Sequence, residues 1–120
     1  MMARPSPRSL YVERILQIYR YTPGTSGVVR RADRLLAATL YHRHIPLDLI
    51  AAALLVATSR RILRPTDAPP LRPIATLHYF LPVIDELTAL PLDPAYLDYL
   101  RKRLTQLTPA FAAALNHQLS

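Results

Sequence analysis

The sequence has no cysteine, no tryptophan and only two glycines among its 120 residues. The absence of cysteine excludes a disulfide framework, a thiolate zinc site, an iron–sulfur cluster and a cysteine nucleophile. Long apolar runs are also missing, because the longest uncharged and mainly apolar stretch, 49–59, is too short to cross a bilayer. The first residues lack the apolar segment of a signal peptide, so we expect a cytoplasmic protein that does not enter a membrane.

Acidic residues are also few compared with basic residues. Eight Asp and Glu stand against fifteen Lys and Arg, which gives a formal net charge of +7 and an isoelectric point near 10.4. The excess lies in the N-terminal half, because residues 1–64 carry a net charge of +8 and residues 65–120 carry −1. This balance favours a polyanionic partner, either nucleic acid or another anionic surface.

The rest of the composition is typical of a folded helical protein. Hydrophobic residues make up 51% of the chain, which is enough to fill a core. Apolar residues recur with helical spacing between the twelve prolines, and alternation with a period of two is rare. We predict an all-α fold, a compact bundle of five or six helices in a single domain at 9–120, preceded by a disordered basic arm at 1–8.

Breaks rich in proline and glycine divide the chain into predicted helices. These helices span about 10–21, 28–44, 46–63, 74–90, 94–107 and 110–119. A stiff proline-rich linker at 65–73 separates the basic N-terminal half, 9–64, from the C-terminal helices, 74–119. The helix at 46–63 is apolar on every side, so we expect the other helices to surround it.

Capping residues and prolines indicate where several helices begin. The candidate N-terminal caps are Ser9, Asp93 and Thr108. Pro82 either kinks the fourth helix or starts its second half. If Pro82 starts the second half, Asp85 and Glu86 lie in its first turn, where acidic residues are favourable. Their position therefore favours a helix start at Pro82 over a kink. The spacing in the second helix predicts an inward stripe of Val28, Ala32, Leu35, Leu36, Thr39 and Leu40.

The stretch 24–34 is the strongest candidate for an anion site. Its predicted phosphate-contacting residues are Thr25, Ser26, Arg30, Arg31 and Arg34. A helix N-terminus carries unpaired N–H groups and the positive end of the dipole, so arginines in the first turn destabilise it unless an anion binds there. A phosphate would meet backbone N–H groups, hydroxyls and guanidinium groups together. The alternative is that these arginines are solvated or pair with acids such as Asp33.

A second basic cluster lies at the end of the third helix. Its members are Arg60, Arg61 and Arg64, beside the proline-rich linker. The negative end of a helix dipole favours cations without any ligand, so this cluster has both a structural and a nucleic-acid-binding interpretation. The same structural explanation is preferred for 101–103 at the end of the fifth helix. The first two helices also suggest a helix-turn-helix-like element, in which the second helix would enter a major groove.

The histidines and acids form no recognisable metal or catalytic set. His42 and His44 are two residues apart, so a helix places them on different faces, and no further ligands lie nearby. We expect His78 to lie in the core, since its segment is apolar. No nucleophile–base pair stands out, so we expect no enzyme activity, no metal and no cofactor. The seven tyrosines are expected mostly at the edge of the core.

Two stretches resemble known sequences. The stretches are 45–54, IPLDLIAAAL, and 73–87, PIATLHYFLPVIDEL. They resemble small, mostly uncharacterised bacterial proteins that accompany mobile genetic elements and plasmid-type replication genes. The pattern Leu-x-Tyr-Phe-x-x-Val-Ile within the second stretch is similar to the helical C-terminal modules of DnaD-like replication initiators. The resemblance covers about 28–90 and implies an accessory of DNA transactions, without identifying functional residues.

Together these features lead us to expect a nucleic-acid-binding accessory protein of replication or of a mobile element. We expect DNA rather than RNA, contacted at its phosphates through the two basic clusters. The alternative is a small helical subunit or adaptor that binds protein within a larger nucleoprotein, transposase or RNA-guided assembly. A third interpretation is a homodimer whose basic groove spans two copies.

Replacing Arg30, Arg31 and Arg34 by alanine is expected to weaken nucleic-acid binding, because three phosphate-contacting charges would be lost. Fluorescence anisotropy with labelled DNA measures the affinity, and circular dichroism checks that the helical content is intact. An unchanged affinity would remove this stretch from the candidate site.

Overall fold

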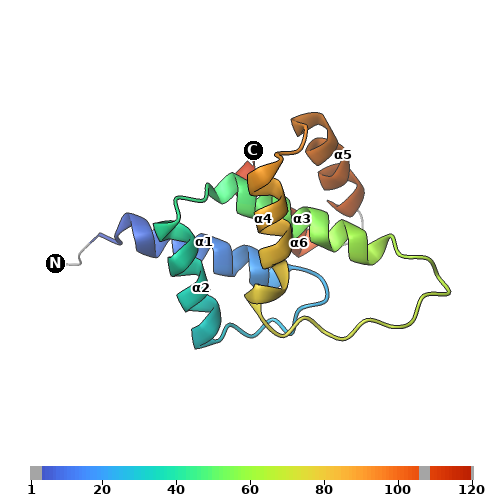
Figure 1. The fold of residues 1–120 in the computed structure, drawn as a ribbon, viewed down its shortest axis with the longest axis horizontal. Coiled ribbons are helices and arrows are strands. Elements are labelled where there is room, and N and C mark those ends of the chain that lie inside the picture. Colours follow the sequence, from blue (N-terminus) through green and yellow to red (C-terminus); the bar gives the residue numbers. More distant parts are fainter. Residues whose placement is uncertain (1–3, 106–108, 120) are drawn as a thin grey trace.

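The fold is built from helices, as Figure 1 shows. The computed structural model describes residues 4–105 and 109–119. Its elements are α1 (Pro7–Tyr21), α2 (Arg31–His42), α3 (Leu47–Ile62), the 3₁₀-helix η1 (Leu77–Phe80), α4 (Leu81–Ala89), α5 (Pro94–Thr105) and α6 (Pro109–Leu119). No β-strand forms within the described residues, and the prediction of an all-α bundle is confirmed.

Helix α3 is the central helix, as its sequence predicts. Residues 50–59 are all buried, and α1, α4, α5 and α6 pack around them. Three consecutive alanines, 51–53, allow neighbouring helices to approach closely. The one buried threonine of this stretch, Thr58, donates its hydroxyl to the carbonyl of Leu54 at 2.7 Å, so it adds no unpaired polar group. Among the described residues, no helix is long and apolar enough to cross a membrane.

Helix α1 begins earlier than predicted. The hydroxyl of Ser6 accepts a hydrogen bond from the N–H of Ser9 at 3.0 Å, and Pro7 takes the first helical position. Ser9 is therefore not the cap, and Arg8 lies in the first turn of α1 rather than in the predicted arm at 1–8. The reason is that proline at the first position lacks only an N–H that would have no helical partner there.

Helix α2 begins three residues later than predicted and faces the core with different residues. Its buried residues are Asp33, Leu36, Ala37 and Leu40. From the predicted inward stripe, Val28 lies before the helix and is 52% exposed, and Leu35 is 57% exposed. The prediction assumed that an apolar residue would begin the buried face, whereas the buried residue of the first turn is Asp33.

The turn from α2 to α3 is closed by a C-cap motif centred on His44. His44 has a φ of 59°, and its N–H donates to the carbonyl of Tyr41 at 3.0 Å. The N–H of Ile45 donates to the carbonyl of Leu40 at 3.2 Å. These two bonds form a Schellman motif, in which glycine usually takes the left-handed position. His44 therefore has a conformational role in this turn.

The start of α4 settles the alternatives for Pro82. Helix η1 precedes it, and Pro82 lies in the first turn of α4, so the proline starts a helix and does not kink one. The expectation for the acids is wrong, because Asp85 and Glu86 lie beyond that turn and form ion pairs with Arg43 and Arg60.

The predicted start of α5 is confirmed. The Asp93 carboxylate accepts a hydrogen bond from the N–H of Ala95 at 2.8 Å. Helix α6 begins at Pro109 as expected, while its predicted cap, Thr108, lies outside the described residues.

Tyr11 ties α1 to the turn between α2 and α3. Its hydroxyl donates to the carbonyl of Ile45 at 2.7 Å, and its ring meets Tyr41 edge-on at 5.3 Å. Burial raises the pKa of Tyr11 to about 12, against a smaller lowering by Arg43. The folded state therefore favours the protonated hydroxyl.

Stability is expected to fall as the pH rises above 10. Between pH 10 and about 12 the folded protein keeps the Tyr11 proton and the unfolded chain releases it, so this contribution is complete below pH 10 and is lost toward pH 12. The pKa of Tyr19 is also raised, first by burial and then by Asp33, so Tyr19 adds to the decline. Urea unfolding at several pH values measures the slope, which should be shallower in Tyr11→Phe. An equal slope in the variant would contradict the assignment.

Candidate nucleic-acid interface

Two extended segments that are distant in sequence meet beside the end of α3. The connection at 22–30 leads into α2, and the end of the linker leads into η1. The N–H of Ile74 donates to the carbonyl of Gly24 at 2.7 Å, and the N–H of Ser26 donates to the carbonyl of Ile74 at 3.3 Å. Both segments run along the lower edge of Figure 1. This pairing holds the loop that precedes α2 beside the end of α3, where Gly24 packs against Arg61.

The N-terminus of α2 contains its own anion. Asp33 is fully buried, and its carboxylate accepts hydrogen bonds from the N–H of Arg30 and the N–H of Leu77, each at 2.8 Å. A carboxylate in this place satisfies the helix dipole and caps the first turn. The helix therefore does not depend on a phosphate to tolerate its arginines, which corrects the expectation from the sequence.

The two predicted hydroxyl ligands stabilise the loop. The Thr25 hydroxyl donates to the carbonyl of Thr22 at 2.9 Å, and the Ser26 hydroxyl oxygen accepts from the N–H of Val28 at 3.3 Å. These are short-range turn contacts of the kind that threonine and serine commonly make. Thr25 and Ser26 therefore shape the connection that precedes α2.

Two of the six predicted arginines are paired with acids. Arg34 forms an ion pair with Glu13 of α1 at 2.6 Å. Arg60 donates two hydrogen bonds to Glu86 of α4 at 2.8 and 2.9 Å. These bonds hold the pKa of Arg60 above its usual value and that of the Glu86 carboxyl below its usual value. Both pairs are exposed, so they offset charge more than they stabilise the fold.

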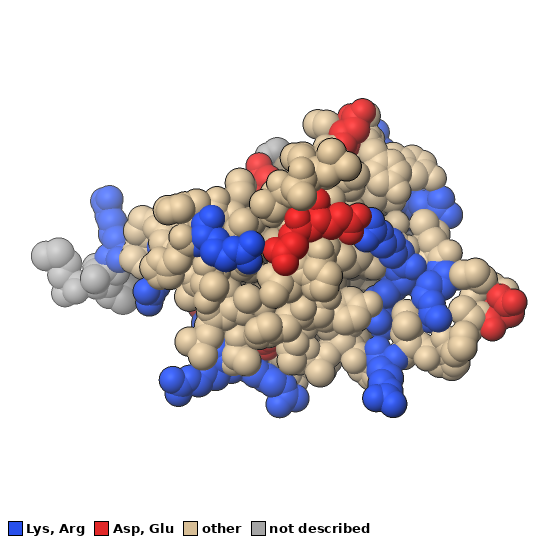
Figure 2. Space-filling view, in the orientation of Figure 1, with Lys and Arg blue, Asp and Glu red and all other residues tan. Residues whose placement is uncertain are grey.

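The other four predicted arginines form no ion pair among the described residues, and the structure adds a fifth. No carboxylate within the described chain lies within 4.0 Å of these five. We call this set the basic rim: Arg30, Arg31, Arg61, Arg64 and Arg72. Figure 2 shows basic side chains along the lower edge and at the right of the molecule, near the end of α3. The sequence did not single out Arg72, because it stands alone between prolines.

Arg61 is the most closely held member of the basic rim. It donates to the carbonyl of Arg72 at 3.2 Å and to the Tyr79 hydroxyl at 3.3 Å, and its guanidinium lies 5.5 Å from the centre of the Tyr79 ring. Gly24, at a φ of 89°, packs against it, since a Cβ there would lie 3.1 Å from the Arg61 Nε. Arg64 similarly donates to the carbonyl of Pro69 at 2.9 Å. These contacts orient both side chains without neutralising their charge.

A groove opens between these arginines. Its volume is about 380 Å³, and it is lined by Ala57, Arg60, Arg61, Arg64, Leu71, Tyr79 and Val83. The expectation that His78 lies in the core is wrong, because His78 and Tyr79 are both exposed. In a 3₁₀-helix residues three apart share a face, so Leu77 and Phe80 are buried and the two residues between them face solvent. The groove therefore combines cations, an aromatic ring and an apolar floor.

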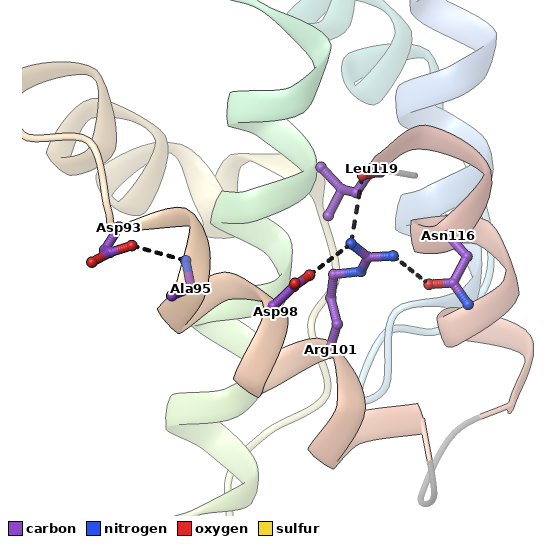
Figure 3. Close-up of polar contacts among 6 residues, drawn as sticks. All are labelled: Asp93, Ala95, Asp98, Arg101, Asn116 and Leu119. Carbon is purple, nitrogen blue, oxygen red and sulfur yellow. Dashed lines mark hydrogen bonds and ion pairs between the residues drawn. The ribbon is translucent and has the colours of Figure 1, made fainter.

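Arg101 has a structural role and is not part of the basic rim. It links α5 to α6 by hydrogen bonds to Asn116 at 2.9 Å and to the carbonyl of Leu119 at 3.5 Å, and it also donates to Asp98 at 3.1 Å (Figure 3). The partner of Asp98 is thus on its own helix, three residues away. Arg101 therefore has a structural role, which comes from side-chain bonds between helices and not from the helix dipole that the sequence suggested.

The arrangement is suited to binding anions. Within the described part of the chain, no group of three or more histidine, aspartate or glutamate side chains could hold a metal ion.

Comparisons with known protein families, with curated proteins and with solved structures find no match to this chain. The resemblance to mobile-element and replication proteins therefore stays an expectation.

Removing the Asp33 carboxylate is expected to destabilise the protein by about 2–4 kcal/mol, because the buried N–H of Leu77 and the partly buried N–H of Arg30 would lose their acceptor. Urea unfolding of Asp33→Ala measures this loss. The control is Asp67→Ala in the exposed linker, which should change stability by less than about 0.5 kcal/mol. Equal effects of the two substitutions would show that Asp33 has no special role.

Proposed function

We propose that this protein binds nucleic acid as an accessory factor and contacts phosphates through the basic rim. The observation that carries the proposal is that five arginines of three segments, the start of α2, the end of α3 and the linker, have no carboxylate partner among the described residues. The loop before α2 pairs with the end of the linker beside Arg61. Arginine suits this task because its planar guanidinium donates two parallel hydrogen bonds to a phosphate. DNA is the proposed form, as the sequence resemblance implies.

The main energy of such binding is the release of counterions from the phosphate backbone. Each phosphate that is neutralised adds about 0.9 to the slope of log affinity against log salt for duplex DNA. A basic rim that engaged all five arginines would give a slope of about 4 to 5. Arg34 and Arg60 contribute less in this proposal, since acids already neutralise them.

Helix α2 is the proposed point of approach to a major groove. Its first turn exposes Arg31 and Ala32, while its buried face is anchored by Asp33. The connection between α1 and α2, 22–30, is longer than the turn of three or four residues in a standard helix-turn-helix. We therefore describe α1, the connection and α2 as a helix-turn-helix-like element, and we propose no DNA sequence that it would prefer.

A second candidate function is that of a protein-binding adaptor. A groove of about 240 Å³ between α1 and α2 is lined by Arg8, Ser9, Val12, Glu13, Arg34, Leu35 and Ala38. The exposed Leu35 in this groove favours an apolar contact with a partner. An adaptor would bind nucleic acid weakly or not at all, and this separates it from the first candidate.

The triple substitution Arg31→Ala, Arg64→Ala and Arg72→Ala is expected to lower affinity for a labelled duplex more than ten-fold near 0.1 M salt, because about three phosphate contacts are lost. The salt slope should fall by about 2 to 3. Fluorescence anisotropy over a series of salt concentrations measures both quantities.

The matched control removes the same charge from outside the basic rim, by Arg8→Ala, Arg14→Ala and Arg43→Ala. It should have a clearly smaller effect. Equal losses in both triple variants would mean that net charge alone drives binding. The absence of salt-dependent binding of the unaltered protein to any nucleic acid would reject the proposed function.

A further inference from the structure

Arg60 differs from the two other arginines that line the groove at the end of α3. Arg60, Arg61 and Arg64 all contribute to the lining of this groove. Arg61 and Arg64 donate their hydrogen bonds to uncharged oxygens of the chain. Arg60 instead donates to both carboxylate oxygens of Glu86 on α4, at 2.8 and 2.9 Å. The groove therefore contains three cations, and one of them is already paired with an anion of the protein itself.

The Arg60–Glu86 pair has the form in which arginine binds phosphate. Nη1 donates to Oε2 and Nη2 donates to Oε1, so two N–H groups of one guanidinium meet two oxygens of one anion. A phosphate offers arginine a similar pair of oxygens, and planar bidentate recognition is common to both anions. The hydrogen bonds from Arg60 hold the pKa of the Glu86 carboxyl below its usual value, so Glu86 is ionised at neutral pH. Glu86 thus occupies the donors at the tip of Arg60 that a phosphate would use.

Exchange of Glu86 for a phosphate would not restore the full contribution of Arg60. A phosphate that took the place of Glu86 would leave this carboxylate unpaired beside the bound phosphate, and the two negative charges would repel each other. If the pair stayed intact, Arg60 would face the phosphate with its charge already neutralised. In either arrangement Glu86 lowers what Arg60 adds to the binding of a polyanion.

We propose that Glu86 is an internal competitor of nucleic acid, which keeps Arg60 from binding phosphate at this groove. Arg61 and Arg64 then carry the binding there, although three arginines line the groove. The inference rests on the proposed function and deepens it, since it names the residue that limits the affinity of this part of the surface. It also makes Arg60 a phosphate-binding residue whose contribution appears once Glu86 loses its charge.

The first variant is Glu86→Gln, which keeps the size of the side chain and removes its charge. Its affinity for a labelled DNA duplex is expected to rise about five- to ten-fold at about 0.1 M salt, because Arg60 adds one phosphate contact. The slope of log affinity against log salt should steepen by about 0.9. Fluorescence anisotropy over a series of salt concentrations measures both quantities. The side chains of Arg60 and Glu86 are 54% and 49% exposed, so the fold should tolerate the substitution, and circular dichroism verifies this.

The matched control is Asp85→Asn on the same helix. Asp85 precedes Glu86 and forms an exposed ion pair with Arg43 at 3.2 Å, so its substitution makes the same change in net charge and also releases one arginine. Arg43 is the C-cap residue of α2 and lies outside the basic rim and the lining of the groove. The affinity of this variant should change by less than about two-fold, because salt screens charges outside the site.

A second control removes Arg60 itself. The substitution Glu86→Gln is made in a protein that also carries Arg60→Ala, and its effect is measured relative to Arg60→Ala alone. The gain in affinity should be smaller than in the presence of Arg60, and the salt slope should no longer steepen, since no arginine is released.

The possible failures are distinguishable. Equal affinities and salt slopes of Glu86→Gln and Asp85→Asn would overturn the inference, since net charge alone would explain both, while salt-dependent binding by the unaltered protein leaves the proposed function in place. An equal steepening in the absence of Arg60 would also overturn it, because Glu86 would then act without Arg60. The absence of salt-dependent binding to the duplex, by the unaltered protein and by Glu86→Gln alike, rejects both proposals.

Discussion

The carboxylate of Asp33 is the interaction on which the arrangement of the N-terminal half depends. It joins the first turn of α2 to the start of η1, 44 residues away, through two backbone N–H groups. A buried carboxylate is tolerated when its oxygens accept hydrogen bonds, and here both do. Because Asp33 points inward, the rotation of α2 about its axis is determined, and Leu35 faces solvent. The position of η1 then determines where the linker must end.

The elements that local chemistry defines could be predicted from the sequence. The apolar stretch 50–59 requires burial on all sides, and Asp93 followed by proline marks a helix start. The direction in which α2 faces could not be predicted, because the partner of Asp33 is a backbone group that only the tertiary structure brings near. The exposure of His78 depends on a 3₁₀ turn, which helical spacing alone does not distinguish from an α-turn.

The candidate site could be predicted only as a set of charges. The sequence indicates two arginine clusters, but it does not reveal which members are neutralised, since Arg34 and Arg60 find their acids 21 and 26 residues away. It also separates into different segments residues that the fold brings together, such as Arg61 and Arg72. Buried and exposed tyrosines have the same local spacing in the sequence. Only the structure shows which tyrosines are buried and which are exposed.

The pairing of Gly24, Ser26 and Ile74 has a consequence for the order of folding. Its two hydrogen bonds close a loop of about fifty residues, which includes all of α2 and α3. Contacts of such large sequence separation carry a loop-closure cost and form after local helices have appeared. Until this closure has formed, the arginines of the basic rim lie on separate segments of the chain. The basic rim therefore exists only in the completed fold. A chain that has not formed this closure lacks the assembled binding surface.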